Sequence, residues 1–131
     1  MSVSPPQLNV ILAWLWITLG VVFGFVLGNF FHQENWLGGY ASLKRRLYRL
    51  AHISIFGLAI INLLFYFTVQ HGAPLSPNLH LASWGFAIGA LSMPFCCLVM
   101  AHRPKLRALF LLPVVSLIAS GFLTLWEVLK P

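Results

Sequence analysis

Residues 8–31 read LNVILAWLWITLGVVFGFVLGNFF, and this stretch contains no Asp, Glu, Lys or Arg. A helix needs about 20 apolar residues to cross a hydrocarbon layer about 30 Å thick, so the stretch is long enough to span a membrane. The Pro5-Pro6 pair before it marks the start of a helix. Residues 1–10 lack the basic region of a cleaved signal peptide, and we therefore expect the first segment to be retained as a span.

Three further stretches have the same apolar character, from about residue 47 to 69, from 79 to 101 and from 106 to 129. The connections between them are short and contain Gly and Pro residues, which favour turns. None of these connections is long enough to fold as a soluble domain. The sequence therefore predicts an all-α, four-helix transmembrane bundle, with residues 1–131 forming a single integral membrane domain.

The composition of the chain also indicates a membrane environment. Hydrophobic residues make up 60% of the sequence and charged residues 8%, and the mean hydropathy is +0.87. Soluble domains average about 45–50% apolar and about 25% charged residues. So few charges cannot cover the surface of a water-soluble domain, and so apolar a chain is not disordered. The net charge of +6 comes from cations between apolar runs, which favours an anionic membrane surface over nucleic acid as the partner.

The Lys and Arg residues predict the orientation of the bundle. In a chain with four spans, seven of the eight fall on one side, where we expect them to contact lipid headgroups, and Lys130 falls on the other. The seven are Lys44, Arg45, Arg46, Arg49, Arg103, Lys105 and Arg107. Cytoplasmic connections carry an excess of Lys and Arg, so the basic connections are expected in the cytoplasm and both termini on the non-cytoplasmic side. The expected location is the bacterial inner membrane.

Small residues at helical spacing mark the faces through which membrane helices contact one another. The first span has such a face with Gly20, Gly24 and Gly28. The third span has one with Gly85 and Gly89. These faces either pack inside the bundle or receive a partner subunit or a flat cofactor. Pro94 and Pro113 lie inside the third and fourth spans and should kink them, unless neighbouring groups satisfy the carbonyls that a proline leaves free.

Histidine is the residue type with most potential for chemistry in this chain. His52 lies about one turn inside the second span, and His32 and His102 lie at span ends on the same side. Neutral imidazole is a good axial ligand for haem iron, so these residues are candidates for binding haem b, and His52 is also a candidate for binding a quinone. The adjacent arginines of the second span could pair with haem propionates. A copper or other metal site and plain interfacial hydrogen bonding are the alternatives.

The chemistry that the sequence lacks also narrows the function. No acidic or basic residue lies near the middle of a span, which argues against a pump that uses a buried carboxylate. There is no catalytic constellation, so we do not expect an enzyme. In size and architecture alone, the chain resembles the haem-bearing or structural anchor subunits of respiratory complexes.

We therefore expect a small accessory subunit of a larger membrane complex, in an electron-transfer chain, with other integral membrane subunits as partners. A small b-type cytochrome or quinone-interacting protein that uses His52 is the alternative. An oligomeric transporter or an assembly factor is a weaker one.

Overall fold

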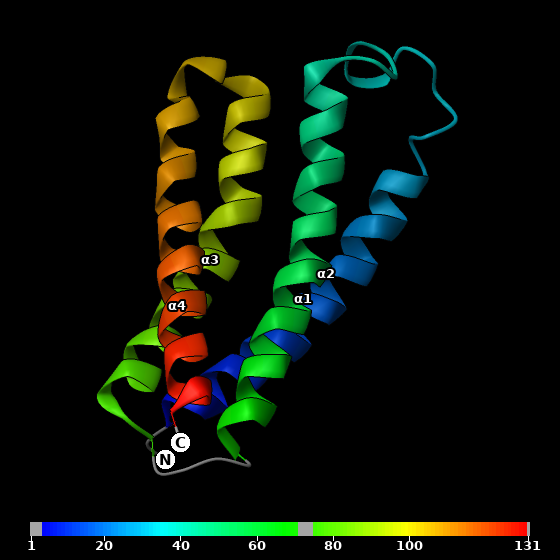
Figure 1. Cartoon of the computed structure of the whole chain (residues 1–131). Coiled ribbons are helices and arrows are strands. Elements are labelled where there is room, and N and C mark those ends of the chain that lie inside the picture. Colours follow the sequence, from blue (N-terminus) through cyan, green and yellow to red (C-terminus); the bar gives the residue numbers. More distant parts are fainter. Residues whose placement is uncertain (1–3, 71–74, 131) are drawn as a thin grey trace.

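The computed structural model describes residues 4–70 and 75–130, and these residues form four packed helices (Figure 1). The four α-helices and two short 3₁₀ segments are α1 (Pro5–Gly28), η1 (Trp36–Gly38), α2 (Leu43–Gln70), α3 (Pro77–His102), η2 (Pro104–Phe110) and α4 (Leu111–Leu129). Helices α1, α2 and α3, and η2 with α4 together, are each long and apolar enough to cross a membrane. The prediction of an all-α bundle of four helices, each able to span a membrane by its length and composition, is confirmed, and these helices indicate an integral membrane protein. Part of the expected connection between α2 and α3, residues 71–74, lies outside the described residues.

The helix ends differ from the expected span ends because polar side chains near them bond to the backbone. Asn29 follows α1, and its side chain donates to a carbonyl of the last turn, so α1 ends earlier than expected. α2 begins earlier, because Ser42 accepts a hydrogen bond from the backbone N–H of Arg45 (3.2 Å). Ser76 caps α3 in the same way, by accepting from Leu79 (3.2 Å). These caps satisfy N–H groups that the first turn of a helix leaves without partners.

α3 is the central helix of the bundle. It packs against both α2 and α4 and also touches α1, whereas α4 packs mainly on α3. In its most apolar stretch, 44% of α3 is buried inside the molecule, against 11% for α4 and η2. Figure 1 shows α4 beside α3, with α1 and α2 on the other side, and the start of α1 at the same end of the bundle as the end of α4. One flank of α4 is therefore left open.

Three fully buried polar residues connect α1, α2 and α3. The side-chain amide of Asn9 donates to Asn62 Oδ1 (2.7 Å) and to the carbonyl of Ser83 (3.1 Å). The amide of Asn62 donates to the carbonyl of Leu58 (2.8 Å), and the hydroxyl of Ser83 hydrogen-bonds Asn9 Oδ1 and the carbonyl of Pro5 (2.8 Å). An unsatisfied polar group inside a membrane protein is costly. Asn9, Asn62 and Ser83 therefore fix how the three helices pack; we call them the buried polar network.

The two prolines inside the spans leave carbonyls that neighbouring side chains satisfy. Pro94 has no N–H for the carbonyl of Ala90, and the indole Nε1 of Trp16 in α1 donates to this oxygen at 2.9 Å. Pro113 likewise cannot donate to the carbonyl of Leu109, which is close to the backbone N–H of Leu111 and is contacted by the thiol of Cys96 in α3 at 3.5 Å. Each proline thus creates an acceptor that connects its own helix to a neighbouring one.

Candidate functional site

His52 lies in α2 and faces the glycines of α1. Its Nε2 is 3.1 Å from the carbonyl oxygen of Gly20, and because a carbonyl only accepts, Nε2 must carry the hydrogen. The ring makes edge contacts with Phe23 and Phe56, at centroid distances of 5.9 and 5.3 Å. In this structure the nitrogen that would bind an iron therefore serves as a hydrogen-bond donor between two helices.

The other two candidate histidines lie apart from this contact. The Nε2 of His102 is 2.9 Å from the hydroxyl of Tyr48, which connects the end of α3 to α2. His32 lies in the turn after α1 and is exposed. Within residues 4–70 and 75–130, no hydrogen bond or ring contact joins any two of His32, His52 and His102. Nor do the described residues hold a group of three or more His, Cys, Asp or Glu side chains that could bind a metal ion.

Two of the candidate packing glycines of α1 contact side chains of α2, and the third faces open space. A Cβ built on Gly20 would lie 2.8 Å from the ring of Phe56, and one on Gly24 would lie 2.7 Å from Nε2 of His52. The groove of α1 is thus filled by side chains of α2, which leaves no space for a flat cofactor at these two glycines. A Cβ on Gly28, by contrast, would meet no atom within 4 Å.

The glycines of α3 face α4. A Cβ built on Gly85 would lie 1.9 Å from the hydroxyl of Ser120, and one on Gly89 would lie 2.4 Å from Leu117. The hydroxyl of Ser116 donates to the carbonyl of Gly85 at 2.6 Å. These close contacts explain how α4 packs on α3 with few large side chains between them.

Arg45 is buried, although it belongs to the basic group that we expected to contact lipid headgroups. It is 2% exposed, and its guanidinium donates to the carbonyls of Phe31 (2.8 Å), Gln33 (3.3 Å) and Glu34 (3.4 Å). The same group lies over the ring of Tyr40, 5.2 Å from the centroid. Arg45 therefore holds the connection between α1 and α2 in place, because five fixed donors suit a set of backbone carbonyls.

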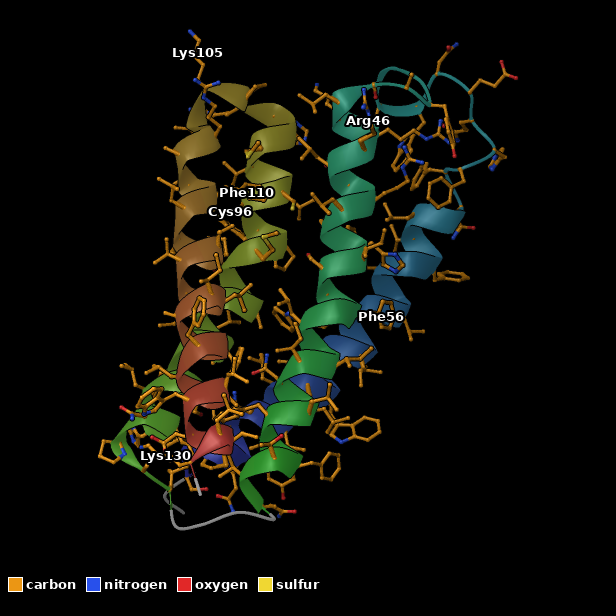
Figure 2. The ribbon with its side chains drawn as sticks, viewed as in Figure 1. Arg46, Phe56, Cys96, Lys105, Phe110 and Lys130 are labelled. Carbon is orange, nitrogen blue, oxygen red and sulfur yellow. The ribbon has the colours of Figure 1, made fainter. Side chains whose placement is uncertain are left out.

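The remaining cations produce a strong charge asymmetry along the bundle. Figure 2 shows Arg46 and Lys105 at one end and Lys130 at the other. Lys130 forms an ion pair with Glu127 at 2.6 Å, so these two charges compensate each other. The first end, which we call the basic end, has the seven other cations and Glu34 and therefore the whole net charge of +6.

The basic end contains two adjoining hollows between the first connection and the turn after α3. The larger has a volume of about 490 Å³ and is lined by Leu37, Gly38, Ser42, Leu43, Lys44, Ala101, His102 and Pro104. The smaller, of about 410 Å³, shares His102 and Pro104 with it and adds Arg103, Lys105 and Leu106. We call the two together the basic-end hollow.

A third cavity is apolar and lies between α2 and α4. It has a volume of about 330 Å³ and is lined by Ile61, Leu64, Phe65, Thr68, Phe86, Gly121, Thr124, Leu125 and Val128. We call it the α2–α4 groove. It exists because α4 packs mainly on α3 and leaves a gap beside α2.

Comparison of the chain with protein-family models, with curated proteins and with solved structures gave no match. Sequence reasoning missed the role of Arg45 and both cavities. For Arg45, the aromatic residues Phe31, Trp36 and Tyr40 in the preceding connection were the available indication, because a guanidinium packs well on aromatic rings.

Proposed function

We propose that this protein is a small accessory subunit of a larger membrane complex, and that a transmembrane helix of another subunit packs in the α2–α4 groove. The groove is the observation on which the proposal depends. Placing the complex in an electron-transfer chain is the more specific form of the proposal, and it rests on the resemblance in size and architecture to respiratory anchor subunits.

The walls of the groove suit a helix. Leu64 and Leu125 are 60% and 52% exposed, and their side chains flank an apolar trough. Gly121 also lines it, and a Cβ built on Gly121 would meet nothing within 4 Å, unlike those on Gly85 and Gly89. Small residues allow the backbones of membrane helices to approach closely. Gly121 thus offers an unfilled contact of the same kind that α3 and α4 use within the chain.

A photo-crosslinking residue at Leu125 tests the proposal, with the same residue at Val115 as the matched control. Both positions lie on α4 and are largely exposed, but Val115 does not line the groove. In native membranes we expect Leu125 to give an adduct of one reproducible mass with another membrane protein, and Val115 to give lipid adducts. Native electrophoresis after mild solubilisation should show the chain in a complex of the corresponding size. Adducts of Leu125 with lipid alone would refute the proposal.

Two further outcomes distinguish the alternative functions. Adducts of Leu125 only with a second copy of this chain would indicate an oligomer, as for a transporter or an assembly factor. A Soret band in the purified protein that His52→Ala abolishes would indicate a b-type cytochrome. The hydrogen bond from His52 to Gly20 makes us expect a protein without this band.

We also propose that the basic end faces the cytoplasm of a bacterial inner membrane, with the start of α1 and the end of α4 outside. The charge asymmetry supports this orientation. A cysteine at exposed Lys44 should then resist a membrane-impermeant thiol reagent added outside the cell, and should react after the membrane is opened. Labelling in intact cells would show that the protein has the opposite orientation.

A further inference from the structure

We propose that the basic-end hollow binds the phosphate headgroup of an anionic phospholipid, and that it prefers a lipid with two phosphates. This inference does not depend on the accessory role or on the α2–α4 groove. It assigns three exposed cations of the basic end, Lys44, Arg103 and Lys105, to a shaped site.

The electrostatics of the basic end favour an anion. Glu34 is the only acidic residue at this end, against seven cations, and it does not line either part of the hollow. Lys44 lines the larger part, while Arg103 and Lys105 line the smaller, and all three are exposed. The guanidinium of Arg45 already donates to backbone carbonyls, so Arg45 is not one of the cations that bind the phosphate.

The backbone adds further donors. The larger part of the hollow includes Leu43 and Lys44, the first two residues of α2. Their N–H groups precede that of Arg45, which is bonded to Ser42, and the first N–H groups of a helix have no acceptor inside it. A helix start also has a partial positive charge, so it attracts phosphate.

His102 lies where the two parts of the hollow meet. Its Nε2 is held by the hydroxyl of Tyr48 at 2.9 Å, which fixes the orientation of the ring. In the tautomer in which the phenol donates to Nε2, the ring hydrogen is on Nδ1, and a phosphate oxygen can accept it. A cation on each side of His102 gives two adjoining positions for negative charge, and this arrangement is the reason for expecting a lipid with two phosphates.

The apolar part of the lining distinguishes a lipid from a soluble anion. Leu37, Leu43 and Leu106 contribute side chains to the walls, and Leu43 is 53% exposed. Trp36 and Tyr40 lie in the same connection, and such aromatic residues are typical of the membrane–water interface. A headgroup bound here would therefore have its glycerol and first acyl carbons against apolar walls.

Native mass spectrometry of the full, delipidated chain in detergent micelles tests the inference. The probes are cardiolipin, which has two phosphates, phosphatidylglycerol, which has one, and zwitterionic phosphatidylcholine. We expect retention in that order. The double variant Lys44→Gln, Lys105→Gln should retain about tenfold less cardiolipin, because each lysine near an anionic lipid contributes substantially to its binding.

The double variant Arg46→Gln, Arg107→Gln is the matched control, since it also removes two charges and both arginines are exposed at the same end but line neither part of the hollow. We expect it to retain cardiolipin within about twofold of the unmodified chain. An equal loss in the Arg46→Gln, Arg107→Gln variant would show diffuse charge attraction and overturn the site. Equal retention of the three lipids would do the same. Displacement of cardiolipin by inorganic phosphate at similar concentration would reassign the hollow to a soluble anion. Unchanged helical circular dichroism of each variant verifies that it has folded.

Discussion

The hydrogen bond from Trp16 to the carbonyl of Ala90 gives the sharpest test of how this bundle is held together. Ala90 is fully buried, and Pro94 cannot supply the N–H that its carbonyl would otherwise receive. Trp16→Phe keeps an aromatic ring but removes the only hydrogen-bond donor of the side chain. A buried carbonyl without a partner costs about 1–3 kcal/mol, and hydrogen bonds between membrane helices average about 0.6 kcal/mol. We expect Trp16→Phe to lower the free energy of unfolding by about 1–2 kcal/mol.

The smaller ring of Phe also loses packing, and a double-mutant cycle separates the two effects. In a Pro94→Ala background, residue 94 can donate to Ala90 within α3, so the indole is no longer needed. We expect Trp16→Phe to cost about 1 kcal/mol less in that background. The assay is reversible unfolding in mixed micelles with increasing dodecyl sulfate, followed by helical circular dichroism.

Trp14→Phe is the matched control for this cycle. Trp14 lies on the same helix but is 61% exposed, and we expect its substitution to change the free energy of unfolding by less than about 0.5 kcal/mol. If Trp16→Phe cost as much in the Pro94→Ala background as in the unmodified chain, the indole would contribute only by packing. That result would refute the reasoning about the freed carbonyl.

Three further predictions concern other contacts. In the same assay Gly85→Ala should cost about 1–3 kcal/mol, because its Cβ would lie 1.9 Å from the hydroxyl of Ser120, and Ser120→Ala should recover most of this loss. Asn62→Leu should cost about 1–2 kcal/mol, and the double variant with Asn9→Leu should cost less than the two single variants summed. Arg45→Lys should make the connection of residues 29–42 several-fold more sensitive to limited proteolysis, because one ammonium cannot bond three separate carbonyls in the same geometry.

Each of these predictions has a control within the chain. Gly57→Ala should be tolerated, since its Cβ would meet nothing within 4 Å. Thr68→Val removes an exposed hydroxyl that bonds only within α2, so it should change the free energy of unfolding little. Arg46→Lys should leave proteolysis unchanged, because Arg46 is exposed and makes a single bond to Ala41. If a control variant changed the free energy of unfolding or the proteolysis as much as its test variant, the corresponding contact would not be the cause of the change.

The four spans could be predicted from the sequence because hydropathy and length alone determine whether a helix can cross a bilayer. The condition attached to Pro94 and Pro113, that neighbours must satisfy the freed carbonyls, could be stated as well. The identity of Trp16 and Cys96 as the neighbours could not be predicted. Which residues of two helices meet depends on their rotation and offset, and an apolar pattern that runs around the whole helix does not specify either.

The candidate site could be predicted less well, for the same reason. Asn62 stands out in the sequence as a polar residue at mid-depth, but its pairing with Asn9 and Ser83 depends on how three helices pack. The aromatic residues before α2 indicate that an arginine packs on them, but the sequence shows charge and not burial, so it does not single out Arg45 from its basic neighbours. His52 has residue chemistry that suits a cofactor, whereas the structure places it against Gly20. Residue type thus indicates what a side chain is able to do, and the contacts decide which ability is used.

The buried polar network also has a consequence for biogenesis. Asn9, Asn62 and Ser83, and the carbonyls they bond, all belong to the first three helices. A nascent chain that has released α3 from the ribosome therefore already contains every partner of the network, so these helices can associate while α4 is still inside the ribosome. α4 then docks against a preformed surface, in which Gly85 leaves room for Ser120.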